Sequence, residues 1–108
     1  MNKETKPFSY SVSEGAFVKI AETAMLSIDG IANTKKQRIV VHCDKGCVTV
    51  EIHIYAYYGV QLRTLALTIQ QQVAQAIRTM AEPKKLFVHV TIEDLLIQSN
   101  CKTVTIGG

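Results

Sequence analysis

Several sequence features that carry known chemistry are missing from this chain of 108 residues. It has no P-loop, no G-x-G-x-x-G dinucleotide fingerprint and no G-x-S-x-G nucleophile elbow. No apolar run approaches the roughly 20 residues that span a bilayer, and the start of the chain lacks the apolar stretch of a signal peptide. These absences favour a cytoplasmic binding module over an enzyme, and we predict no catalytic residues.

Cysteine is scarce, with three in the whole chain. A sulfur-rich metal site would need Cys-x₂-Cys pairs, and Cys43 and Cys47 are spaced more widely. If Lys45 and Gly46 form a two-residue turn, Cys43 points to the core side and Cys47 to the outer face. A disulfide needs Cβ atoms about 3.8 Å apart, which opposite faces do not allow. We therefore predict reduced thiols, no metal ion and no cofactor.

What is present is the composition of one globular domain, with 47% hydrophobic residues, 19% charged residues and a net charge of +3. We divide the chain into a polar N-terminal tail at 1–7, a single α/β domain at 8–97 and a C-terminal tail at 98–108. The tail carries a weak alternation at Val104 and Ile106. The mildly basic balance permits a nucleic-acid partner without requiring one.

Hydrophobic periodicity predicts six elements. They are a strand at 8–12, a helix that begins at Ser13 and Glu14 and stops at Gly30, strands at 38–43 and 47–58, a helix from 62 that Pro83 ends, and a strand at 84–95. The order is β-α-β-β-α-β. We expect an α+β fold, a two-layer α/β sandwich with two helices on one face of a mixed or antiparallel sheet.

Alternation assigns one side of each strand to the core. The long strand buries its even positions, which are Val48, Val50, Ile52, Ile54, Ala56 and Tyr58. The second helix offers the stripe Leu62, Leu65, Ala66, Ile69, Val73, Ala76, Ile77 and Met80. The last strand contributes Leu86, Val88, Val90 and Ile92, and Cys43 points inward from the strand before the turn.

The opposite side of the sheet is unusually aromatic for a surface that faces water. It carries His53, Tyr55, Tyr57, Phe87 and His89. Because tyrosine and phenylalanine are enriched at protein interfaces, we predict that this face, or the edge beside it, packs on another protein chain. In the alternative interpretation the C-terminal tail folds back over it.

The three histidines all fall on this outer face. His42 lies opposite Thr49 in the predicted hairpin, four residues from His53, or about 13 Å along the strand. That distance is too long for a shared metal ion, so we interpret them as solvent-facing side chains or as a pH-responsive patch. The sequence pattern does not pair the acids Glu51, Glu93 and Asp94 with a base.

A small RNA-binding module is the second hypothesis. Basic residues that could contact a phosphate backbone are Lys35, Lys36, Arg38, Lys84 and Lys85. The G-x-x-G clamp of KH modules is absent, and so is the RNP1 consensus of RRM sheets. We favour solvated loops for these lysines. A third hypothesis is a subunit or regulator of a metabolic complex.

The block from Ile52 to Val90 resembles the alkaline shock protein family, also called the envelope stress response or Gls general-stress family. The resemblance rests on three groups of residues. They are Tyr58, Gly59 and Val60 at the end of a strand, Ile69, Gln70, Val73, Ala76, Ile77 and Met80 in the helix that follows, and Phe87, Val88, His89 and Val90 in the last strand. The earlier Ser13-Glu14, Ile20-Ala21 and Asp29-Gly30-Ile31-Ala32 are also similar. Members of the family often carry a long insert between the first helix and the next strand, and here this insert is only NTKKQ. After the last strand, the usual Gly-Val is replaced by Thr91, Ile92, Glu93 and Asp94.

The resemblance implies a Gram-positive bacterial protein without catalysis that takes part in the cell-envelope stress response. It also implies self-association into a homo-oligomer and a membrane-anchored partner protein that brings a cytoplasmic chain to the membrane. Within the motif we expect Gly59 to matter most, through a backbone conformation open to glycine or a close approach of another group.

Overall fold

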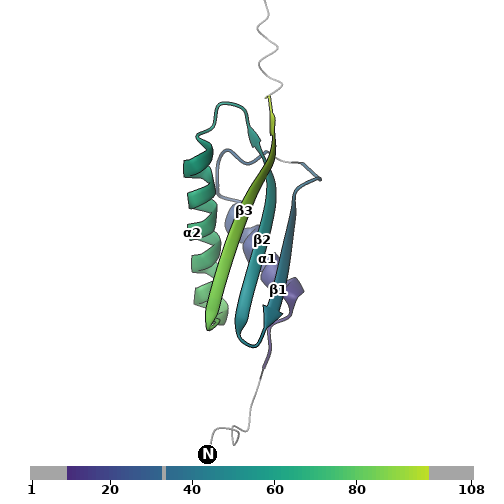
Figure 1. Ribbon diagram of the computed structural model, residues 1–108, viewed down its shortest axis with the longest axis vertical. Coiled ribbons are helices and arrows are strands. Elements are labelled where there is room, and N and C mark those ends of the chain that lie inside the picture. The colour runs from purple at the N-terminus through teal and green to yellow at the C-terminus, as the bar shows by residue number, and fades with distance from the viewer. Residues whose placement is uncertain (1–9, 33, 98–108) are drawn as a thin grey trace, which may run out of the picture.

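The computed structural model describes residues 10–32 and 34–97. Its elements are α1 (Glu14–Met25), β1 (Arg38–Asp44), β2 (Cys47–Tyr57), α2 (Leu62–Ala81) and β3 (Lys85–Leu96). The three strands form one mixed sheet in the order β1-β2-β3, with β1 antiparallel and β3 parallel to β2. Both helices pack on the same face of this sheet (Figure 1). The predicted two-layer α+β arrangement is therefore confirmed.

The predicted order β-α-β-β-α-β is not shown, because the described chain reads α-β-β-α-β. Of the strand expected at 8–12, residues 10–12 have no strand geometry, and 8–9 lie outside the described residues. Val12 instead packs half-buried against the core. Ser13 directly after it caps α1 by accepting a hydrogen bond from the amide of Ala16. The alternation at this position therefore reflects a lead-in to the helix.

Helix α1 starts where predicted but ends at Met25, before Gly30. The chain leaves the helix early because its next residues pair with the end of β2. The amide of Ala32 donates to the Tyr55 carbonyl at 2.6 Å, and the amide of Tyr57 donates to the Gly30 carbonyl at 3.1 Å. Gly30 has φ of 100° and makes the bend that this pairing requires.

The β1–β2 hairpin has the predicted register. Asp44 pairs with Cys47 around a two-residue turn in which Lys45 and Gly46 have φ of 50° and 84°. Positive φ at both central positions suits the right-handed twist of the flanking strands. Helix α2 then carries the chain across to β3, as a parallel pair of strands requires.

The core lies between the sheet and the helices. Its centre is formed by side chains of β2 and α2 with no exposed surface, namely Val50, Ile52, Ile54, Ile69, Val73 and Ile77. The predicted inward residues of β3 pack against this core but stay half-buried, since β3 is an edge strand.

Four residues that we expected in the core are exposed. Tyr58 is 73% exposed and Met80 68% exposed, while Leu62 and Cys43 are exposed as well. Strand β2 ends at Tyr57, so Tyr58 lies where the chain turns away from the sheet toward α2. The other three lie at the ends of α2 and near the end of β1, where the opposing layer no longer covers them.

Candidate interaction surface

The face of the sheet opposite the helices has no layer on it among residues 10–32 and 34–97 (Figure 1). We call it the open sheet face and define it by the outward side chains of β2 and β3 with their neighbours on β1. Its main members are Arg38, Val40, Thr49, Glu51, His53, Tyr55, Tyr57, Phe87, His89, Thr91 and Leu96.

The five residues predicted for this surface all lie on it, in two groups. His53, Tyr55 and Tyr57 are half-buried on the central strand, while Phe87 is 56% exposed and His89 exposed on the edge strand. The register places Phe87 beside Thr49, eight residues before Tyr57 on β2. The surface thus extends about 26 Å along the sheet, with aromatic side chains toward both ends.

A register shift in β3 determines the local geometry of this face. Ile54 pairs with Ile92, but Tyr55 pairs with Asp94, so Glu93 is an extra residue in the edge strand. This β-bulge brings the Glu93 carboxylate 2.6 Å from Nδ1 of His53. Sequence reasoning left Glu93 without a base, and that prediction is wrong. Alternation places Glu93 on the same face as His53, but the sequence does not give the register between β2 and β3, so the pair itself could not be predicted.

The His53–Glu93 pair has a defined polarity. An ionised carboxylate only accepts hydrogen bonds, so Nδ1 of His53 is the donor. The pair holds the imidazole ring through its Nδ1 atom. Among the described residues, Glu93 is the hydrogen-bond partner that the structure gives this ring. A nucleophile that would complete a catalytic constellation is not part of that arrangement.

The three histidines lie on three different strands of the sheet. His42 pairs with Thr49, as predicted, and His89 lies beside Glu51 on the other side of β2. Within residues 10–32 and 34–97, no group of three or more His, Cys, Asp or Glu side chains could hold a metal ion. The geometry therefore favours their interpretation as separate surface side chains.

The basic residues proposed for RNA contact are split between two ends of the molecule. Lys35, Lys36 and Arg38 precede or begin β1, whereas Lys84 follows α2 and donates its amide to the Gly46 carbonyl beside the hairpin turn. The length of β1 separates these clusters by about 20 Å. The structure does not bring them together as one phosphate-binding stripe.

Two of the three cysteines lie within the described residues, and both are free thiols. Cys43 is exposed, and its amide donates to Oε2 of Glu14 at 3.1 Å. Partial desolvation of the sulfur, and secondly the negative charge of Glu14, raise the pKa of the Cys43 thiol. A raised pKa disfavours the reactive thiolate. Cys101 lies outside the described residues.

The predicted motif Tyr58, Gly59 and Val60 forms the junction between β2 and α2. Gly59 has φ of 100°, and a Cβ added there would have no neighbour within 4 Å. Its role is therefore conformational, and the alternative of a close approach is wrong. At Gly30 the same φ is combined with crowding, because an added Cβ would lie 3.2 Å from a methyl group of Val60.

Comparison with known proteins gives a curated relative, a solved structure and a protein family. A curated relative, an uncharacterized protein (Spy1535) of Streptococcus pyogenes serotype M6, is 32% identical over 59 residues, which is 55% of this chain. The matched region spans 46% of that relative, about half its length. Among solved structures, the C-terminal domain of the magnetosome protein MamB of Desulfamplus magnetovallimortis has a similar fold. Its TM-score is 0.56 at 19% identity, over 76% of this chain and 96% of that one.

Within the part of the chain that the structure describes, no helix is long and apolar enough to cross a membrane. The model of the alkaline shock protein 23 family, described as having a cell envelope-related function, matches residues 32–97, from the residue that pairs with β2 to the end of β3. Residues 32–97 include the open sheet face and the Tyr58-Gly59-Val60 junction. The chain belongs to this family of alkaline shock proteins with a cell envelope-related function.

Proposed function

We propose that the chain is a non-catalytic interaction module of the cell envelope, in which the open sheet face binds a second copy of the chain. A membrane-anchored partner protein then holds the assembly at the envelope. The observation that carries this proposal is the aromatic composition of a sheet face that has no covering layer among the described residues, with Phe87 56% exposed.

The area of the face supports a reversible contact. Three strands about 4.8 Å apart, with a central strand of 11 residues rising about 3.3 Å each, offer roughly 500 Å² of flat sheet. Side-chain relief adds to this figure. A standard stable interface buries about 800 Å² on each partner. A face-to-face pair is therefore near the lower end of the range for specific association.

The chemistry of the face also suits a protein partner. Tyrosine rings present a large apolar area with a polar tip and lose little conformational entropy when they bind. The His53–Glu93 pair and Thr91 beside it add polar groups between the two aromatic ends. This mixture is typical of reversible interfaces, in which aromatic anchors supply most of the affinity.

Sedimentation velocity over a concentration series tests the proposal. We expect the wild-type chain to self-associate and Tyr57→Ser and Phe87→Ser each to weaken association about tenfold or more, the loss typical of an aromatic anchor. Tyr58→Ser is the matched control, since this neighbouring tyrosine is 73% exposed and lies beyond the end of β2. A wild-type chain that stays monomeric at high concentration, or an equal effect of Tyr58→Ser, would contradict the proposal.

The membrane-anchored partner is tested by affinity capture from native cells at low and high salt. We expect a membrane protein to co-purify with the wild-type chain in both conditions. Capture of RNA that is lost at high salt would instead favour the RNA-binding alternative, because phosphate contacts weaken steeply with salt.

A further inference from the structure

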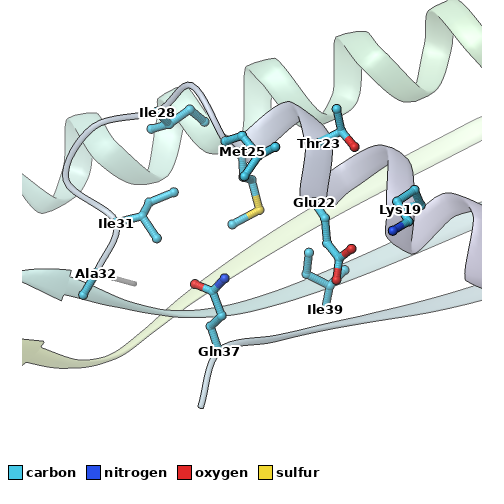
Figure 2. Close-up of a pocket in the computed structure, with 10 residues that line it drawn as sticks. Lys19, Glu22, Thr23, Met25, Ile28, Ile31, Ala32, Gln37 and Ile39 are labelled. Carbon is cyan, nitrogen blue, oxygen red and sulfur yellow. The ribbon is translucent and has the colours of Figure 1, made fainter. Parts of the chain in front are cut away.

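A groove on the helix side of the sheet lies apart from the open sheet face. It has a volume of about 510 Å³ and runs between the C-terminal half of α1, the segment that follows it and the start of β1. Figure 2 shows Met25 and Ile31 directed into this space and Ile28 along its upper edge, while Glu22 extends down from α1 toward Ile39 and Gln37 lies at the lower side. The groove is thus lined by both apolar and polar side chains.

The groove borders the edge of β1 that faces away from β2. The amide of Cys43 donates to Glu14 of α1 and not to β2, which shows that Cys43 directs its backbone groups to this outer edge. In an antiparallel strand alternate residues direct their backbone groups to the same side. Val41 and Ile39 therefore also present their amides and carbonyls along this edge.

A strand added at this edge would place side chains in the groove. Residues directly opposite each other in paired strands project to the same face of the sheet. The side chain of Ile39 projects toward the helix layer and lines the groove. The residue opposite Ile39 in an added strand would therefore direct its side chain into the groove, and so would the residue two positions away.

Two other parts of the sheet edges are protected by helix side chains. Glu14 accepts from the Cys43 amide at the far end of β1. On the opposite edge of the sheet, Nε2 of Gln70 in α2 donates to the Val88 carbonyl of β3 at 3.1 Å. Such contacts guard an edge strand against pairing. The start of β1, beside the groove, is the part of the edge where backbone groups and a cavity lined partly by apolar side chains coincide.

We propose that residues 103–106 of a second copy pair with the start of β1 and place Val104 and Ile106 in this groove. This segment reads Thr-Val-Thr-Ile, four β-branched residues with apolar side chains at alternate positions. Added as a strand, it puts both apolar side chains on the helix side and both threonines on the open side. This is strand addition at an exposed edge, with apolar side chains supplying specificity.

Geometry favours a second copy over the same chain. Leu96 at the end of β3 pairs with Tyr57, whereas Ile39 pairs with Ile52, five residues lower on β2 and about 16 Å away. A strand added beyond β1 would lie about three strand spacings from β3, or roughly 14 Å, which gives a direct distance near 22 Å. The eight residue steps from Leu96 to Val104 span at most about 29 Å. A chain that also had to pass around β1 would therefore have little slack, whereas a second copy has no such constraint.

Photo-crosslinking in the full-length chain tests the proposal. The crosslinking amino acid p-benzoylphenylalanine replaces Ile106, and in a matched control it replaces Thr105, whose side chain would face away from the groove. An equal mixture of ¹⁵N-labelled and unlabelled chains distinguishes contacts between copies from contacts within one chain. We expect the probe at 106 to give mixed-isotope crosslinks to Met25, Ile31 or Ile39, and the probe at 105 to give few of them.

Variants sharpen the test without disturbing the core. With the probe kept at 106, Val104→Asp should reduce the crosslinks to the groove at least tenfold, whereas Thr103→Asp should leave them largely unchanged. Thr23→Trp, at an exposed position of α1 that lines the groove, should also reduce them while helical circular dichroism stays normal. Crosslinks within one chain only, crosslinks to the open sheet face, or no crosslinks at all would overturn the proposal.

The result is independent of the proposed function. Tyr57→Ser should leave the crosslinks to the groove in place, because Tyr57 lies on the other face of the sheet. Conversely, self-association through the open sheet face should persist in Val104→Asp. Each proposal can therefore fail while the other holds.

Discussion

The two faces of strand β2 are formed by alternate residues and differ in how deeply their side chains are buried. On the helix side Val48, Val50, Ile52, Ile54 and Ala56 are between 0% and 4% exposed. On the other side every residue from Cys47 to Tyr57 is half-buried. One face forms the core of the domain, and the other has no covering layer among the described residues. In the proposed function, that outer face is the one that contacts another molecule.

The largest effect should come from the inner face. Ile54→Ala removes a fully buried side chain between the sheet and α2, and we expect a loss of about 3–4 kcal/mol in the free energy of unfolding. Tyr55→Ala, one position along on the outer face, should cost less than about 1 kcal/mol. Chemical denaturation of both variants measures the difference. Equal losses would show that the two faces are not distinct.

The next effect concerns the glycines where the chain enters and leaves the sheet. Gly59→Val places a β-branched residue where the backbone φ is 100°, although its side chain would meet no neighbour. We expect this strain to lower the free energy of unfolding by about 1–3 kcal/mol. Gly30→Val should cost more, since the new side chain also meets Val60. Thermal unfolding of the two variants gives this ranking. A melting temperature that is unchanged in Gly59→Val would refute the conformational role of the glycine.

A smaller effect should follow from opening the guarded edge of β3. Gln70→Met keeps the length of the side chain but removes the donor to the Val88 carbonyl, and should cost about 0.5–1.5 kcal/mol. Gln71→Met, at an exposed position on the same helix, serves as the control and should change little. Denaturant titration compares the two. If the control loses as much stability, the hydrogen bond of Gln70 contributes nothing specific.

The smallest effect is on thiol reactivity at the end of β1. Because the Cys43 pKa is raised, less thiolate is present near pH 8 than for an ordinary cysteine, so alkylation should be slow. Glu14→Gln removes the negative charge, lowers that pKa and should increase the rate about two- to threefold. Mass spectrometry of iodoacetamide labelling at Cys43 measures this rate, with Glu22→Gln as the control. A slower rate in Glu14→Gln would reverse the assigned sign.

The central part of the fold could be predicted from the sequence because it depends on local periodicity. Alternation from Val48 to Ala56 indicates a strand with one buried side, and the spacing of Leu65, Ile69, Val73 and Ile77 indicates a helix that packs on it. The turn at Lys45 and Gly46 fixes the register of the hairpin. The outward position of the aromatic residues follows from the same alternation.

The remaining features depend on contacts between distant segments. The end of α1 is set by the hydrogen bonds of Gly30 and Ala32 to β2, and local helical spacing does not show them. The His53–Glu93 pair depends on the register between β2 and β3, which brings together residues 40 positions apart in the chain. The exposure of Tyr58 follows from where the sheet stops. Periodicity alone predicts neither bulges nor the ends of a sheet.

The most direct test of the open sheet face is an NMR dilution series on the full-length chain carrying Val104→Asp and Ile106→Asp, so that docking of the tail does not contribute. The account predicts concentration-dependent shifts for the side chains of Tyr55, Tyr57 and Phe87. Signals of Leu67 and Met80, exposed apolar residues of α2, should stay constant. Shifts confined to α2, with the outer side chains of β2 and β3 unchanged, would contradict it.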